Sequence, residues 1–261
     1  MPKPTPKASD DATMPFLEHL AELRQRLLRA AIAIASTTLA CFFVAEYIYL
    51  WLAQPLLSAL PDDKQRLVFL DPVEPFLVYV KVAAIAGVLA ASPYVLYQLW
   101  KFVAPGLYAR EKRAVVPFVL LGSIFFFGGA AFCRYVVLPY GLETLMGVGF
   151  DTQTMAIEPQ ITMEAYLSVS TKMLLAFGIV FELPVLVLFL SWAHLITYQT
   201  LLKRWRGALV LCVLIGAILT PPDVITQLML FVPLYTLYLL SIGIAWVFGA
   251  RPKKQSAADP D

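Results

Sequence analysis

The sequence predicts an all-α integral membrane protein with six transmembrane helices, and three observations support that fold class. Of the 261 residues, 60% are hydrophobic and 15% are charged, whereas soluble domains are about 45–50% apolar and about 25% charged. The mean hydropathy is +0.74. Long apolar runs alternate with polar connections, and the basic residues gather in every second connection.

The apolar runs define the predicted spans, which cover residues 28–50, 76–99, 115–138, 166–192, 205–219 and 224–247. The fifth run has about 15 residues, or about 22 Å of helix, which is short of a hydrocarbon core of about 30 Å. It stops at Pro221-Pro222, where the chain must turn. We therefore expect the last two helices to be short and to form a tight hairpin. Residues 14–248 are expected to be one membrane domain, between flexible tails at 1–13 and 249–261.

The basic residues predict the orientation of the spans. Most of the 20 basic residues lie in the N-terminal segment, the second-to-third connection, the fourth-to-fifth connection and the C-terminal tail. The other connections carry mainly acids, among them Asp62, Asp71, Glu74, Glu158 and Glu164. Because cytoplasmic loops are enriched in Lys and Arg, both termini are predicted to be cytoplasmic.

Prolines interrupt four of the spans, at Pro93, Pro117, Pro184 and Pro233. A proline removes a helical hydrogen bond and bends the helix. Bent helices around a polar group favour a concave face over a tight bundle.

The polar group is Glu182, in the middle of the run from Tyr166 to Trp192. A charged side chain at this depth costs roughly 2.5–3.5 kcal/mol on insertion scales. Such a cost is tolerated where the residue faces a cavity, a partner or the bundle interior. The pattern indicates a functional polar feature of a cavity or interaction surface, and the alternative is a carboxyl group hydrogen-bonded inside the bundle.

Two acids stand out on the basic side of the membrane, Glu22 and Glu111. Both lie close to the predicted membrane surface, where two carboxylates suit a cationic partner. An arginine fits a carboxylate with two parallel hydrogen bonds. The alternative for Glu22 is a local pair with Arg26, four residues on, worth about 0.2–0.5 kcal/mol. A local ion pair is also the alternative for Glu111.

The sequence shows no pattern for catalysis, a metal or a nucleotide. Cys41, Cys133 and Cys212 lie in apolar runs without CxxC spacing, which favours small buried hydrophobes. His19 and His194 are far apart and lack ligand spacing, and there is no Gly-rich phosphate loop. We expect no enzyme activity, no cofactor and no nucleic-acid partner.

Several segments together resemble the TatC subunit of the twin-arginine protein translocase. The resemblance covers about residues 14–248 and is carried by FLEHLAELR at 16–24, AQPL at 53–56, FVAPGLY at 102–108, EKR at 111–113, FGIVFELPV at 177–185 and LTPPD at 219–223. Each segment alone is weak, but together, in this order on six spans, they are specific.

The resemblance implies a core receptor subunit in the bacterial inner membrane that exports folded proteins using the protonmotive force. Its implied partners are twin-arginine signal peptides, TatA-like and TatB-like single-span proteins, further copies of itself and membrane lipid. It assigns Glu22 and Glu111 to the paired arginines, with Arg24 and Phe102 beside them. It also makes Pro55 a functional position in the first outer loop and turns Glu182 toward the concave side. Partner docking falls on the last two spans, near the hairpin tip, at Thr220, Asp223, Thr226 and Gln227.

Two other classes remain open on the residues alone. A proton-coupled small-solute transporter accounts for Glu182, but not for Glu22, Glu111 or the short fifth span, and the chain shows no internal repeat. A structural assembly scaffold would tolerate neutralisation of Glu22 and Glu111.

Overall fold

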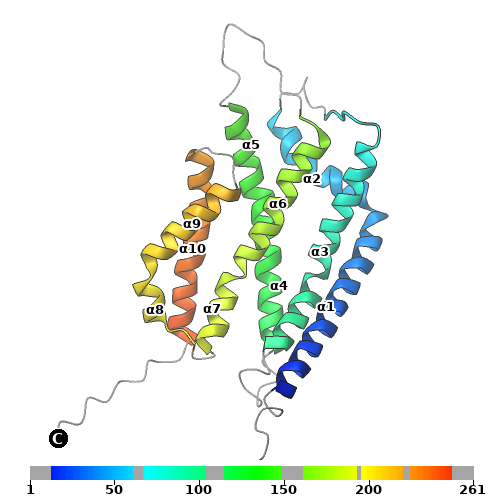
Figure 1. Ribbon diagram of the computed structural model, residues 1–261. Coiled ribbons are helices and arrows are strands. Elements are labelled where there is room, and N and C mark those ends of the chain that lie inside the picture. The colour runs from blue at the N-terminus through cyan, green and yellow to red at the C-terminus, as the bar shows by residue number, and fades with distance from the viewer. Residues whose placement is uncertain are drawn as a thin grey trace, which may run out of the picture.

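The computed structural model describes residues 13–60, 67–103, 115–147, 161–192, 195–219 and 224–248. Within these ranges the chain is mostly helical, and the longer helices run roughly side by side (Figure 1). The elements are α1 (Thr13–Phe42), α2 (Ala45–Ala59), α3 (Glu74–Val103), α4 (Val115–Phe132), the π-helical turn η4 (Cys133–Val137), α5 (Leu138–Gly147), α6 (Met163–Phe181), α7 (Leu183–Trp192), α8 (Tyr198–Lys203), α9 (Trp205–Leu219) and α10 (Val224–Phe248).

Four stretches are long and apolar enough to cross a membrane: Glu74–Phe102, Val116–Thr144, Met163–Trp192 and Leu230–Val247. They match the second, third, fourth and sixth predicted spans. The fifth, α9, has 15 residues, as the sequence predicts. The sixth, α10, was expected to be short and instead has 25 residues, about 37 Å of helix. Pro233 lies inside α10 without ending it, so only one helix of the hairpin is short.

The first span differs from its prediction as one run over 28–50. It consists of α1 and α2, whose axes differ by 84° across a short break. Neither residue at the break, Phe43 or Val44, is a glycine or proline. The bend instead follows from packing, since α2 buries Tyr49, Leu52 and Leu56 in the interior. Counting this bent pair as one span and adding α9 gives six; the six-span count and the orientation of the termini stay predictions.

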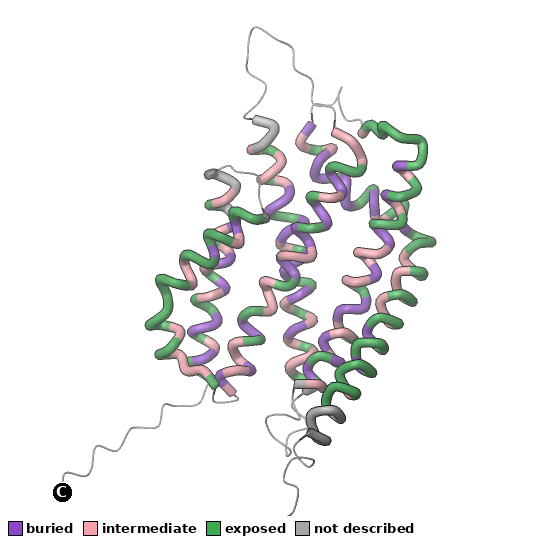
Figure 2. The backbone as a smooth tube through the Cα atoms, in the orientation of Figure 1, coloured by how far each residue is buried: buried purple, intermediate pink, exposed green. Residues whose placement is uncertain are grey.

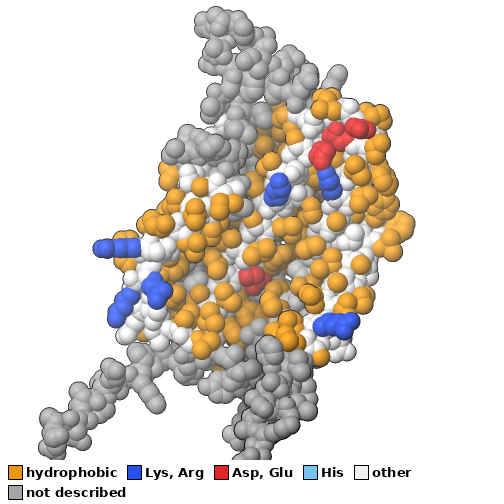
Figure 3. All heavy atoms as spheres, viewed as in Figure 1, with side chains coloured by type: hydrophobic (Ala, Val, Ile, Leu, Met, Phe, Trp, Pro, Cys, Tyr) orange, Lys and Arg blue, Asp and Glu red, His pale blue; other side chains and the backbone are white. Residues whose placement is uncertain are grey.

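Buried side chains form two hydrophobic clusters, one at each end of the bundle. The larger joins α2, α3, α6 and η4 through residues such as Leu56, Val78, Cys133 and Phe177. The smaller, around Trp100, Phe126, Val185 and Phe189, lies toward the end predicted to be cytoplasmic. α1 packs mainly on α3 and is exposed along most of its length (Figure 2). The face drawn in Figure 3 is mostly hydrophobic, with few charged side chains, as a lipid-facing surface requires.

The N-terminal ends of α3 and α6 are held together by Glu74, which is buried. Its carboxylate accepts hydrogen bonds from the backbone N–H of Leu70 at 2.9 Å and of Glu164 at 3.0 Å. Lys81 of α3 forms an ion pair with Glu164. These contacts fix the start of α6 and therefore the register of the helix that leads to Glu182.

α1 and α3 approach each other closely at Gly87. Thr37 donates a hydrogen bond to the Gly87 carbonyl at 2.8 Å. A Cβ atom added to Gly87 would lie 2.6 Å from both the N and Cα atoms of Thr38. These are backbone atoms, so the two helices would have to separate to admit even a methyl group.

We therefore expect Gly87→Ala to destabilise the protein by about 1–3 kcal/mol, as overpacking does elsewhere. Gly128→Ala is the matched control, because an added Cβ there meets nothing within 4 Å. The control should be neutral or stabilising by up to about 1 kcal/mol, because alanine is the better helix former. Thermal unfolding of both variants in detergent checks this. Equal unfolding temperatures would contradict the close approach of the two helices.

Candidate functional site

Glu22 lies one helical turn before Arg26 on α1, and the two side chains form an ion pair. Arg26 Nε donates to Glu22 Oε1 over 3.2 Å, and Arg26 is mostly buried. Side chains four residues apart meet on a helix surface. The local ion pair weighed as the alternative for Glu22 is thus present. It occupies Oε1 and fixes the direction of the carboxylate.

The second oxygen of Glu22 faces an aromatic pair. His19 Nδ1 lies 3.8 Å from Glu22 Oε2. The His19 ring stacks on Phe102 at the end of α3, with ring centres 4.3 Å apart and planes 12° from parallel. The structure therefore brings Phe102 close to Glu22, as predicted. His19 was not among the predicted site residues, yet its spacing three residues before Glu22 in the sequence places both side chains on one helix face.

The other two predicted members of this site are placed differently. Arg24 is exposed on α1, two residues from both Glu22 and Arg26, and therefore points to another face of the helix. Glu111 lies outside the described residues, in the segment 104–114. One nitrogen of Arg26, Nη1, is buried without a hydrogen-bond partner among the described residues.

Glu182 follows the last residue of α6 and directly precedes α7. It is half-buried, and its Oε1 is buried without a hydrogen-bond partner in the described part of the chain. Its carboxylate lies against Gly122 of α4. A Cβ added there would be 3.0 Å from Oε2 and 3.2 Å from Oε1. Gly122 thus leaves the room that this carboxylate occupies, a role that the sequence analysis missed.

Of the four docking residues predicted near the hairpin tip, the structure describes one side chain. Gln227 of α10 donates a hydrogen bond from Nε2 to the Val213 carbonyl of α9 at 3.3 Å. This contact ties the two helices of the hairpin together. Thr220 and Asp223 lie outside the described residues, as does the side chain of Thr226. Beside this contact α9 presents exposed apolar side chains, including Val210, Leu214 and Ile218.

The described residues contain no group of three or more His, Cys, Asp or Glu side chains that could hold a metal ion. What the site offers is an oriented carboxylate beside stacked aromatic rings at one end of the bundle and a second carboxylate in its middle. This arrangement suits binding of a cationic group.

Comparison with known proteins identifies the family. Residues 18–233 match the family model of the Sec-independent protein translocase protein (TatC). The chain belongs to the TatC family. It is therefore a subunit of the twin-arginine translocase, a multi-pass membrane protein of protein transport that works with partner proteins.

Known TatC proteins and a solved TatC structure are similar to this chain over most of its length. The Sec-independent protein translocase protein TatC of Desulforapulum autotrophicum is 39% identical over 93% of this chain and 88% of its own. That of Aquifex aeolicus is 40% identical over 93% of this chain and 98% of its own. A crystal structure of a twin-arginine translocase receptor TatC superposes with a TM-score of 0.76 at 38% identity, covering 88% of this chain and 98% of that one. These matches confirm the all-α fold and the resemblance read from the TatC family motifs.

Proposed function

We propose that this chain is the receptor subunit that binds twin-arginine signal peptides at the ends of α1 and α3. The observation that carries the proposal is the position of Glu22, whose carboxylate lies between Arg26 and the His19–Phe102 stack. The similar crystal structure is described as a twin-arginine translocase receptor, which supports the same assignment. Both termini, and this site, then face the cytoplasm, where precursors arrive.

Glu22 can accept an incoming arginine without losing its internal partner. Arg26 holds Oε1, while the neighbour of Oε2 among the described residues is the His19 ring, at 3.8 Å and so beyond hydrogen-bonding distance. A peptide guanidinium can therefore bind Oε2, which points in a fixed direction and has no hydrogen bond to the described residues. Because Arg26 has already ordered the carboxylate, less side-chain entropy is lost on binding.

The stacked rings add a surface for the flat guanidinium group. Arginine stacks on aromatic faces, whereas the ammonium group of lysine is a compact, strongly hydrated charge. Glu111 supplies the second carboxylate in this proposal, so that each arginine of the pair has its own acid. The apolar part of the signal peptide then continues along the hydrophobic surface toward Glu182.

The experiment that tests the proposal is binding of a fluorescent twin-arginine signal peptide to the purified chain in detergent, compared with the same peptide carrying Lys-Lys. We expect the Lys-Lys peptide to bind about ten-fold or more weakly, because an ammonium group does not stack on the aromatic rings and lacks the planar set of N–H donors of a guanidinium. A scrambled peptide of equal charge is the control. Equal binding of all three peptides would reject the receptor assignment in favour of a scaffold role.

The hairpin of α9 and α10 is proposed to dock the transmembrane helices of TatA-like and TatB-like partners, with transport driven by the protonmotive force. α9 is too short for a bilayer of about 30 Å. The hydrophobic length of α9 therefore does not match the bilayer thickness beside its exposed apolar side chains. A partner helix can cover these side chains at a lower free-energy cost than lipid can.

Single cysteines on the exposed face of α9, at Leu214 or Ile218, should form disulfide crosslinks with a TatB-like helix in membranes. The native Cys41, Cys133 and Cys212 are free thiols and must first be replaced. A cysteine at Ile32, on the exposed face of α1, is the matched control. Crosslinks that appear only at Ile32 would move the docking surface to the first span.

A further inference from the structure

The prediction that Pro55 lies in the first outer loop is wrong, because Pro55 is inside α2. There it leaves a backbone carbonyl of the helix without its usual partner. Proline has no N–H, so the carbonyl of Trp51, four residues earlier, receives no hydrogen bond from the helix. Pro55, Ala53 and Leu56 are buried. An unpaired carbonyl beside a buried surface is costly, so its partner has to come from elsewhere in the protein.

Arg134 of η4 supplies that partner. Its Nη2 donates a hydrogen bond to the Trp51 carbonyl and lies 3.4 Å from Gln54 Oε1. The guanidinium also stacks over the Trp51 ring, 4.7 Å from its centre, and lies 5.4 Å from the ring centre of Tyr135. Arg134 is 4% exposed. All four contacts are with neutral groups, so the side chain works as a directed donor rather than as half of an ion pair.

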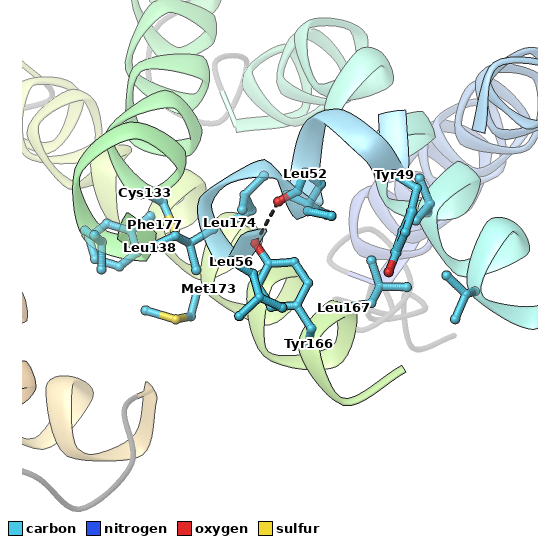
Figure 4. Close-up of a cluster of buried hydrophobic side chains, with 14 of the residues drawn as sticks. Tyr49, Leu52, Leu56, Cys133, Leu138, Tyr166, Leu167, Met173, Leu174 and Phe177 are labelled. Atoms are coloured by element: carbon cyan, nitrogen blue, oxygen red, sulfur yellow. Dashed lines mark hydrogen bonds between the residues drawn. The ribbon is translucent and has the colours of Figure 1, made fainter. Parts of the chain in front are cut away.

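The next carbonyl of α2 is also bound by another span. The hydroxyl of Tyr166 in α6 donates to the Leu52 carbonyl at 2.7 Å, and both residues are buried (Figure 4). Two successive carbonyls just before Pro55 are thus held by side chains from two other helices. We call Arg134, Tyr166 and these two carbonyls the carbonyl latch.

The latch explains how α2 keeps its direction. Because α2 turns by 84° from α1, the preceding helix does not set its course. η4 is a π-helical turn, a feature that inserts an extra residue into a helix and is frequent at functional sites. Here it carries the arginine that reaches α2. A buried cation without a carboxylate partner among the described residues is expensive, which argues that its hydrogen bond to Trp51 has a purpose.

We propose that Arg134 is a positioning residue that holds α2 through the carbonyl freed by Pro55. It takes the place of the missing proline N–H, and the two residues act as a pair. The consequence for transport rests on the proposed function: the latch keeps the outer end of the bundle in the shape that translocation needs, and it leaves signal-peptide binding at the other end unchanged.

The test is a double-mutant cycle in the full chain, read by amide hydrogen exchange of α2 in detergent. Arg134→Met should raise the exchange rate of the α2 amides by about tenfold, because one charge-assisted hydrogen bond is lost. Pro55→Ala returns an N–H to the Trp51 carbonyl, so in that background Arg134→Met should raise exchange by less than about threefold. Lys172→Met is the control, since Lys172 is an exposed lysine on α6 without a hydrogen bond or ion pair to the described residues.

An unchanged α2 exchange rate in Arg134→Met, or the same increase in both backgrounds, would overturn the latch. If Arg134→Met does not fold, recovery of folding in the Pro55→Ala/Arg134→Met variant supports the pairing, and failure of both rejects it. Peptide binding is measured on the same samples. Wild-type protein that binds no twin-arginine peptide would reject the receptor function, while the exchange comparison still decides the latch. Loss of peptide binding in Arg134→Met alone would overturn its assignment to the outer end.

Discussion

Glu22→Ala and Glu111→Ala should each weaken binding of a twin-arginine signal peptide, by between a few-fold and about a hundredfold. A charge-assisted hydrogen bond is lost in each case, and solvent at this end of the bundle reduces its contribution. Phe102→Ala should have a smaller effect, because it removes the support under the His19 ring but leaves the carboxylate. Titration of a labelled peptide against each purified variant gives the affinities.

The ion pair with Arg26 makes a folding control necessary. Removing Glu22 leaves the mostly buried Arg26 without its acid, and an unpaired buried charge is destabilising in its own right. Glu22→Gln keeps an oxygen acceptor for Arg26 and removes the charge that a peptide arginine needs. The Glu22→Gln variant should therefore fold normally but bind the signal peptide more weakly than the wild type does. Glu46→Ala removes an exposed acid from α2 and should leave binding unchanged. Full affinity in both Glu22 variants and in Glu111→Ala would sink the recognition site.

The sequence was sufficient to predict the parts of the fold that depend on local chemistry. Long apolar runs located four spans, and the double proline at 221–222 correctly ended α9 at Leu219. The 84° bend between α1 and α2 was not predictable, because Phe43 and Val44 carry no helix-breaking signal. An apolar run shows that a segment avoids water, but its direction is set by what it packs against, here Leu52 and Leu56 in the core.

The candidate site was predictable in its residues and not in its contacts. Glu22 was a candidate because it is an acid close to the membrane on a basic face. Glu182 was a candidate because it is an ionisable residue inside an apolar run. That Phe102 reaches Glu22 through His19 depends on how α1 and α3 are packed, which Gly87 and Thr37 fix far from the site. The contact of Arg134 with α2 could not be predicted from the sequence, because Arg134 and the segment around Pro55 are about 80 residues apart in the chain. Long-range hydrogen bonds of this kind leave no periodic pattern.

Glu182 should matter for export more than for recognition. It lies in the middle of the apolar stretch Met163–Trp192, whereas Glu22 lies near the start of α1. Its carboxylate rests on Gly122 of α4, and its Oε1 has no hydrogen-bond partner among the described residues. A polar atom left in this position is available to water or to a polar group of a partner helix. A lipid-facing position would carry the full insertion cost.

Glu182→Gln should retain assembly and much of the export, because the amide keeps the shape and an oxygen acceptor. Glu182→Leu and Glu182→Lys should impair export of a folded reporter several-fold or more, since the first removes the polar group and the second places a cation at a costly depth. Gly122→Val is an independent probe from α4: its side chain would displace the carboxylate without changing its chemistry, and export should fall as in Glu182→Leu. Gly128→Val, at an open position on the same helix, is its matched control.

Each variant is assayed for signal-peptide binding as well as for export. Binding should stay within about twofold of wild type, because the site at Glu22 shares no residue with this one. A loss of binding that parallels the loss of export would place Glu182 in recognition and reject the separation of the two sites.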